Sequence, residues 1–342
     1  MELFKGNNVP AIYTRILDKI LTEGREVGPR GLKTKELSPV CIEVTDPRLR
    51  LFGHPHRKDV PIFTYIEGLW MLLGDDKPDM VVHYVPAMAN FVNEKTGLFD
   101  GAYGPAILGM EHITIHRCKA IRFFLEKNQL EMAYERLKED PDTRQAIVMI
   151  NQPYLHKLPT KDYPCTLSFQ FLLRNGLLDM IVNMRSQDAW LGLIYDTGEF
   201  QWFQEILAGW LGVELGRYIH IDGSLHLYER DWVKAREVVD KDANFSIYDE
   251  AIVHTTKEDR MGKEEFDIML NNLALWEECC RTNNFNKIQK GICFKNSFYK
   301  NLVTIITAYN LRLRGFKEAS YEMVRFNHSD LGLIYESRWR EK

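Results

Sequence analysis

The sequence predicts an α+β protein whose last hundred residues form an α-helical extension. Three patterns indicate this architecture. Segments with helical spacing alternate with short apolar runs typical of strands, an Asn-Gly pair at 175–176 separates two such runs, and the residues after about 235 are typical only of helices. The 342 residues are 45% hydrophobic and 27% charged, which suffices for a sizeable core. We therefore expect a body over residues 1–235 and a helical extension over residues 236–342.

The first part of the body is expected to contain two helices and several strands. Residues 7–24 place a proline near a first helical turn and continue with apolar residues at helical spacing. Residues 38–52 are typical of a strand, a turn and a second strand. Residues 62–76 indicate a mostly apolar helix that carries one acid, Glu67, and residues 145–151 indicate a buried strand.

The second part of the body contains the clearest turn. Residues 167–185 are predicted to form two strands joined at 175–176, because Asn-Gly is the strongest short hairpin signal. Residues 198–212 place large apolar side chains on one helical stripe. Residues 217–231 indicate a strand, an Asp-Gly turn and another strand. After the body, two segments are predicted to be helical: residues 264–281 and 297–314.

Composition argues against several classes of function. A net charge of −4 gives no bulk attraction to nucleic acid, and no run is apolar enough for a membrane span. The first residues lack the apolar core of a signal peptide. The cysteines show no spacing typical of a metal site, so we expect no metal and a reducing, cytoplasmic setting. They are Cys41, Cys118, Cys165, Cys279, Cys280 and Cys293.

One cysteine has neighbours that suggest chemistry. Cys165 follows a proline at the start of a predicted strand, and Arg185 and Ser186 end the next strand. An arginine and a serine can bind a phosphate, and the arginine favours a thiolate at the cysteine. His226 and Tyr228 share a strand face. A lone cysteine beside an apolar strand is more often structural, so the functional interpretation depends on these partners.

Residues 163–200 and 222–231 resemble the thymidylate synthase superfamily. They contain its Pro-Cys, Phe-Gln-Phe, Arg-Ser-x-Asp, Leu-Gly and His-x-Tyr elements in the family's order, and the likeness extends over residues 9–232. The resemblance implies an α+β fold with a large mixed sheet. It also implies a homodimer that binds a nucleotide and a folate.

The resemblance implies a covalent mechanism. The Cys165 thiolate adds to C6 of a pyrimidine nucleotide, and C5 then attacks a one-carbon unit from 5,10-methylenetetrahydrofolate. Glu67 and Tyr103 are the further catalytic residues, and burial should raise the pKa of Glu67 and suit it to proton transfer. Asp188 and Gly192 are expected at the folate. The remaining contacts implied are Arg30, Arg185, Ser186 and, from a second subunit, Arg144 for the phosphate, and His226 and Tyr228 for the sugar.

Asp196 stands where the family reads uracil with an asparagine. A carboxylate can accept a hydrogen bond from the amino group of cytosine and share a proton with N3. Opposite uracil, the carboxylate would face O4, so that two hydrogen-bond acceptors would oppose each other. We therefore expect a cytosine nucleotide as the substrate. Enzymes of this superfamily with an aspartate at this position resemble cytidylate hydroxymethylases. From the residues alone, Asp196 can also be a helix cap, since Thr197 and Gly198 precede a helical stripe.

Three further departures favour addition of water over methylation. Thr166 replaces a family histidine, residues 83–100 lack the tryptophans that flank the folate, and a helical extension replaces the short closing tail. The expected function is folate-dependent 5-hydroxymethylation of a cytosine nucleotide. We favour CMP over dCMP, because the long chain resembles the hydroxymethylases of nucleoside antibiotic biosynthesis. A methylating thymidylate synthase-like enzyme and a catalytically inactive nucleotide-binding relative are the alternatives.

Overall fold

A six-stranded mixed sheet forms the centre of this computed structural model, in the order β1-β4-β11-β9-β8-β7. The pairs β1–β4 and β11–β9 are parallel, and the other neighbours are antiparallel. The α+β class with a large mixed sheet is thereby confirmed. The strands are β1 (Glu2–Gly6), β4 (Val40–Val44), β7 (Ile147–Met149), β8 (Thr166–Arg174), β9 (Leu177–Met184) and β11 (Glu214–Asp222).

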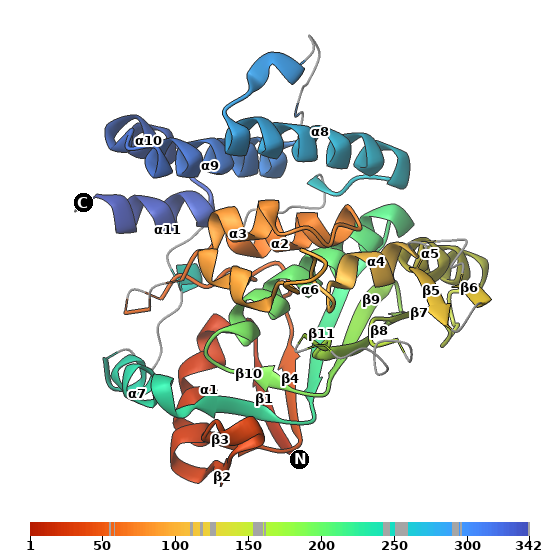
Figure 1. Ribbon diagram of the computed structural model, residues 1–342, viewed down its shortest axis with the longest axis vertical. Coiled ribbons are helices and arrows are strands. Elements are labelled where there is room, and N and C mark those ends of the chain that lie inside the picture. Colours follow the sequence, from red (N-terminus) through yellow and green to blue (C-terminus); the bar gives the residue numbers. More distant parts are fainter. Residues whose placement is uncertain are drawn as a thin grey trace.

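Four short strands form a second sheet at the lower end of the molecule in Figure 1: β10 (Gln187–Asp188), β12 (Leu225–Tyr228), β3 (Thr34–Leu37) and β2 (Arg25–Val27). β5 (His112–His116) pairs only with β6 (Lys119–Phe123). The structure describes residues 1–54, 56–57, 59–109, 112–116, 119–123, 128–152, 160, 162–241, 247–249, 259–288, 294 and 296–340.

The predicted hairpin at Asn175 and Gly176 is confirmed. Both residues have positive φ angles, 52° and 76°, which is the backbone of a type I′ turn between β8 and β9. The predicted Asp-Gly turn after β11 has a different role. β11 belongs to the large sheet and β12 to the small one, so the turn at Gly223 carries the chain from one sheet to the other.

Helix α6 (Gly192–Leu211) packs on β9 and β11 and is covered by α2 (Phe63–Leu72). It is buried on nearly every side, as expected for a helix between a sheet and a second layer, although several of its buried side chains are polar. The inward face of the sheet is buried, for example at Phe169 and Val182, whereas the outward face carries exposed apolar side chains. The other body helices are α1 (Pro10–Glu23), α3 (Asp79–Tyr84), α4 (Tyr103–Leu108), α5 (Gln129–Glu139) and α7 (Trp232–Lys241).

Two predicted strands differ from the structure. Residues 49–52 are buried but form no strand, because Arg50 turns inward to an ion pair with Glu205 of α6 and the Leu51 N–H donates to the Tyr248 hydroxyl. The strand at 145–151 exists as β7, but it is an edge strand and not a buried one. Ile147 and Met149 are 41% and 46% exposed.

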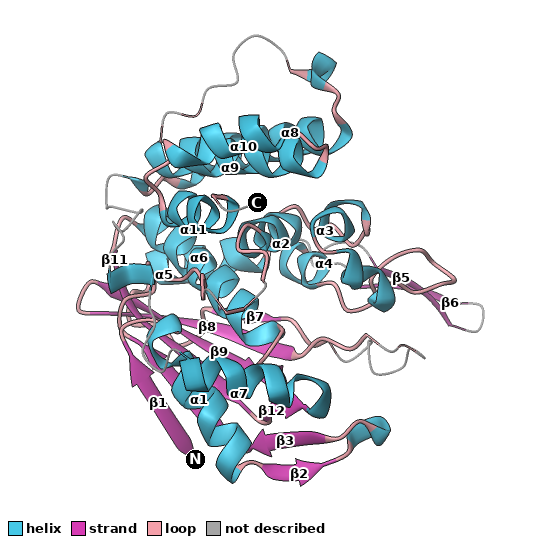
Figure 2. Cartoon of the chain, turned by 90° about the vertical axis from the view of Figure 1, so that its left-hand side faces the viewer, coloured by secondary structure: helices cyan, strands magenta, loops and turns pink. Residues whose placement is uncertain are grey.

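The helical extension is confirmed in its secondary structure. The extension consists of α8 (Lys263–Thr282), α9 (Ser297–Leu313), α10 (Lys317–Arg325) and α11 (Asp330–Trp339). The first three lie in a layer above α2 and α3, whereas α11 lies below that layer, at the level of α2 and α3 in Figure 2 (Figures 1 and 2). Among the described residues, no helix combines the length and apolar character needed to cross a bilayer. The predicted domain boundary at residue 235 lies inside α7, which packs on α1. The division into two domains stays a prediction.

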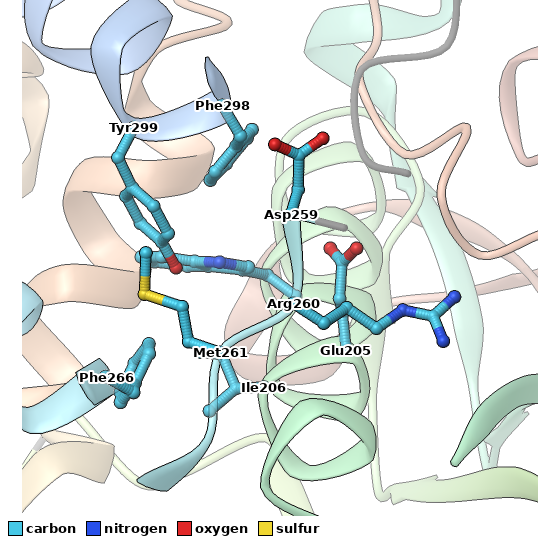
Figure 3. A pocket seen from close by; sticks show the side chains of 9 residues that line it. Glu205, Ile206, Asp259, Arg260, Met261, Phe266, Phe298 and Tyr299 are labelled. Atoms are coloured by element: carbon cyan, nitrogen blue, oxygen red, sulfur yellow. The ribbon is translucent and has the colours of Figure 1, made fainter. Parts of the chain in front are cut away.

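The extension is anchored to the body by polar and aromatic contacts. Asn310 donates to the Tyr84 hydroxyl at 3.0 Å, and Arg338 forms an ion pair with buried Asp59 at 2.6 Å. Figure 3 shows Phe298 and Tyr299 of α9 beside α6, around a cavity of about 20 Å³. This cavity has room for about one water molecule. The extension therefore packs directly on the helix that carries Asp196.

Candidate active site

Five predicted site residues line one cavity of about 770 Å³: Arg30, Arg185, Ser186, His226 and Tyr228. The switch of the chain from β11 to β12 places the last two beside the end of β9. The ring centroids of His226 and Tyr228 lie 5.1 Å apart, and the Ser186 hydroxyl is 3.5 Å from Nδ1 of His226. Two guanidinium groups with hydroxyl and imidazole groups can bind a phosphorylated sugar.

Three other predicted residues, Glu67, Tyr103 and Asp196, line a second cavity of about 180 Å³. They come from α2, α4 and α6, which pack against one another. Acids and a phenol lie here against apolar walls, an environment that suits a flat polar ring. The apolar lining consists of Trp70, Met71, Met88, Phe91, Phe99 and Ala102.

Cys165 connects the residues of the two cavities. Nη2 of Arg185 lies 3.6 Å from the Cys165 sulfur, and Nε and Nη2 of Arg185 also donate to the carbonyls of Pro164 and Tyr163, each at 3.0 Å. On the other side, the N–H of Thr166 donates to the Tyr103 hydroxyl at 3.3 Å. One arginine thus holds the cysteine loop and places a positive charge beside the thiol.

The surroundings of Cys165 favour the protonated form of its thiol. Burial raises the pKa of this thiol above its ordinary value of 9.0, and Arg185 opposes the rise. The carboxyl groups of Asp196 and Asp162 raise the pKa further. Since the thiolate is the nucleophilic form, attack by this sulfur requires loss of a proton.

Asp196 lies in the second turn of α6, which begins six residues earlier than predicted. Asp188, the last residue of β10, caps the turn that precedes α6: its Oδ1 accepts from the N–H groups of Trp190 and Leu191 at 2.8 and 3.2 Å. The helix-cap alternative for Asp196 is therefore wrong. Gln187 instead donates to Oδ2 of Asp196 at 2.8 Å. Burial raises the pKa of Asp196 to about 6, and the bond from Gln187 opposes that rise.

Comparison with known proteins decides the family. The profile of the family described as thymidylate synthase matches residues 11–272.

The chain belongs to the thymidylate synthase family.

Three curated relatives illustrate its place in the thymidylate synthase family. The chain is 36% identical over 236 residues to a deoxyuridylate hydroxymethyltransferase of Bacillus phage SP01, covering 68% of this chain and 60% of that protein. It is 30% identical over 249 residues to a deoxyuridylate hydroxymethyltransferase of Pseudomonas phage M6, covering 71% and 66%. A thymidylate synthase of Bacillus licheniformis is 28% identical over 237 residues, covering 64% and 78%. The chain thus spans less than two thirds of either phage relative.

Gly192 makes room for the contact between Gln187 and Asp196. A Cβ at Gly192 would lie 2.8 Å from Nε2 of Gln187 and 3.1 Å from Oδ2 of Asp196, too close for both groups to stay in place. Its predicted contact with folate stays a prediction, as does that of Asp188. The structure shows a local reason for a glycine at this position, because a larger residue would crowd Gln187 and Asp196.

We expect Gly192→Ala to weaken nucleotide binding by about 10- to 100-fold, the cost of displacing a hydrogen bond to a charged group. Titration calorimetry with the nucleotide measures this effect. Gly262→Ala is the matched control, because a Cβ there meets no atom within 4 Å of the described structure. Equal affinities for the Gly192 variant and the unmodified protein would contradict the role given to Gly192.

Sequence reasoning missed a row of polar side chains behind Asp196. On β11, the Tyr218 hydroxyl lies 2.7 Å from Nδ1 of His220, and Nε2 of His220 lies 3.2 Å from Oδ1 of Asp222. All three are fully buried. Polar residues at every second position of a central strand are the signal that could have revealed them. No comparable sequence pattern points to Gln187, which directly precedes Asp188.

Arg144 lies apart from these residues. It is exposed before β7, its carbonyl accepts from Gln170 at 3.0 Å, and it lines neither cavity. Its role in a partner subunit stays a prediction. No group of three or more potential metal ligands gathers in the described part of the chain. Four cysteines, including Cys165, are free thiols, whereas Cys118 and Cys293 lie outside the described residues.

Proposed function

We propose that this protein transfers a one-carbon unit from 5,10-methylenetetrahydrofolate to C5 of a cytosine nucleotide and completes the reaction with water. The product is a 5-hydroxymethyl nucleotide, with CMP favoured over dCMP. The observation that carries the proposal is Asp196, an acid in the cavity beside Cys165 whose carboxyl group is held by Gln187. Membership of the thymidylate synthase family supports the reaction class.

In this proposal the phosphate and the sugar occupy the larger cavity, and the base occupies the second. Arg30, Arg185 and Ser186 bind the phosphate, and His226 and Tyr228 bind the sugar. The base then extends past Cys165 toward the second cavity. With Gln187 donating to one oxygen of Asp196, the other oxygen is available to accept from the exocyclic amino group of cytosine.

The residues around the base supply the chemistry. The Cys165 thiolate, stabilised by Arg185, forms a bond to C6, and the electron pair displaced from the ring makes C5 nucleophilic. Methylenetetrahydrofolate supplies the carbon that C5 attacks. Tyr103, oriented by the Thr166 N–H, helps a water molecule remove the C5 proton. The electron pair of that C–H bond forms the double bond of an exocyclic methylene group as the bond between this carbon and the folate nitrogen breaks, and tetrahydrofolate leaves with the electron pair of the broken bond. In the last step water adds to the exocyclic methylene group, and the returning electron pair breaks the C6–S bond and releases Cys165.

The pKa of Asp196, raised to about 6, suits cytosine recognition. A carboxyl group that gains a proton near neutral pH can share it with N3 while still accepting from the amino group. Sites built on such matched groups reject a mismatched analogue strongly. Both phage relatives are deoxyuridylate hydroxymethyltransferases, and a uracil nucleotide is therefore the competing substrate.

Incubation with CMP, dCMP, UMP or dUMP in turn, each with methylenetetrahydrofolate, tests the proposal by mass spectrometry. We expect CMP to gain one hydroxymethyl group fastest and dCMP next. Hydroxymethylation of only the uracil nucleotides would overturn the base assignment. Formation of dihydrofolate, seen by absorbance, would show methylation instead. Loss of tritium from C5 of CMP would exclude the inactive-relative alternative.

We also propose that the outward face of the large sheet forms a homodimer. Register and burial place apolar side chains from five strands on this face, among them Leu3, Cys41, Ile147, Met149, Leu177, Ile181 and Ile219. A shared isologous interface would bring Arg144, which precedes the edge strand β7, near a partner's phosphate cavity.

Ile181→Lys should therefore give a monomer, because it places a charge in the centre of this face. Light scattering after size-exclusion chromatography measures the mass. Val233→Lys on α7 is the control, since Val233 is 72% exposed and lies away from the sheet. A dimer that survives the Ile181 change, or an unmodified protein that is monomeric, contradicts this interface.

A further inference from the structure

Glu199 is a buried acid that the proposed chemistry does not use. It lies on α6 one turn after Asp196, and its side chain is 0% exposed. In the described part of the chain, neither of its carboxyl oxygens meets an amide, hydroxyl or cationic donor. A buried ionised carboxylate without such a partner is very costly, so this carboxyl group must hold a proton or share one.

The group that faces Glu199 is a second acid, Glu67. The two carboxyl groups face each other across the α2–α6 interface, and their interaction contributes to the pKa shifts of both. Close helix packing makes this possible: a Cβ at Gly68 would lie 2.9 Å from the Trp202 ring and 3.9 Å from Cγ of Glu199. The other titratable groups around the pair are Asp196 and Tyr218 on the side of Glu199 and Asp162 on the side of Glu67.

Only one member of the pair reaches the cavity. Glu67 lines it beside Tyr103 and Asp196, whereas Glu199 lies behind Glu67 and does not line it. Burial raises the pKa of Glu67 to about 8, and burial beside Glu67 raises the pKa of Glu199 well above its ordinary value. Around neutral pH the ligand-free pair therefore retains its protons, although acids ordinarily lose them far below this range.

We propose that Glu199 is a positioning residue that holds and reprotonates Glu67, so that Glu67 delivers a proton to the base when Cys165 adds to C6. This inference rests on the proposed function, in which Cys165 adds to C6 of the base. As the C6–S bond forms, the proton leaves Glu67 for N3 of the base. It returns to Glu67 when that bond breaks, so the pair ends with the protons with which it began.

The pH dependence of turnover tests this role through Glu199→Gln. A glutamine cannot supply a proton, and its amide N–H stabilises the ionised form of Glu67. We expect the alkaline limb of the kcat/KM profile to move down by about one pH unit or more, with KM for the nucleotide changed less than about threefold. Glu277→Gln is the matched control: it removes a buried acid with a raised pKa from α8, far along the chain from the site. An unmoved profile in the Glu199 variant would overturn the proposal.

A second measurement needs no activity. Infrared difference spectra of the full ligand-free chain, titrated from about pH 6 to about pH 9, report protonated carboxyl groups directly. We expect a titrating carboxyl band in the unmodified protein and in the Glu277→Gln variant. In the Glu199→Gln variant this band should be weaker or should titrate at lower pH. Glu67→Gln should alter the same band, which keeps the test available if Glu199→Gln does not fold. A band unchanged by both substitutions refutes the shared proton. If no cytosine nucleotide reacts but the band behaves as expected, the proposed function fails while the acid pair stands.

Discussion

Asp196→Asn is expected to turn the base preference from cytosine toward uracil. An amide offers one donor and one acceptor, which match O4 and N3–H of uracil, whereas it faces the amino group of cytosine with a donor. The Gln187 amide can follow this change by flipping, because its buried Oε1 has no partner in the described structure. We expect the ratio of kcat/KM values, cytosine over uracil nucleotide, to fall by about 10³- to 10⁴-fold.

Competition between CMP and UMP, and between dCMP and dUMP, in one reaction mixture measures this ratio. Asp162→Asn is the control, because Asp162 lines the same cavity but accepts a hydrogen bond from the Gly101 N–H at 3.0 Å. It should lower turnover on both bases alike. An unchanged base preference in Asp196→Asn would show that another group reads the base.

Cys165→Ser is expected to abolish both turnover and the release of tritium from C5. A serine hydroxyl is far less acidic than a thiol, so Arg185 cannot hold it as an anion for attack on C6. We expect a loss of about 10⁴-fold or more in kcat, since the nucleophile acts in every later step. Nucleotide binding should change little, because the residues proposed to bind the phosphate and the sugar line the larger cavity, whose lining does not include Cys165.

Tritium release from labelled CMP measures the loss of the first chemical step, and calorimetric titration with CMP measures the affinity for the nucleotide. Cys41→Ser is the matched control: Cys41 is also a half-buried free thiol, but it lies on the outward face of the large sheet. It should retain full activity. Appreciable tritium release from the Cys165 variant would mean that another nucleophile starts the reaction.

Features that depend on neighbouring residues could be predicted from the sequence. The Asn175–Gly176 turn pairs β8 with β9, and this brings Cys165 and Arg185 together at the far end of the hairpin. The Arg185 N–H donates to the Cys165 carbonyl at 2.9 Å as a result. His226 and Tyr228 share a face because side chains alternate along a strand. In each case a local rule is enough.

Other features depend on residues that are far apart in the chain. Arg50 reaches Glu205 of α6 and so prevents the predicted strand at 49–52, which no local pattern shows. The apolar stripe predicts a helix that starts at residue 198, whereas α6 begins at Gly192 and contains Asp196. Its partner Gln187 comes from β10 in the second sheet, so only the packed structure reveals that an acid is tolerated inside the helix.

By itself, the sequence determined the α+β class, the hairpin, the helical extension and eight of the residues that line the two cavities, because these follow from periodicity, turn chemistry and motif order. Only the tertiary structure decided that Asp196 is held by Gln187 and that Glu199 faces Glu67 across two packed helices. The physical reason is burial: the protonation and hydrogen bonding of an acid depend on what surrounds it, and here those neighbours are brought together by the packing of distant elements.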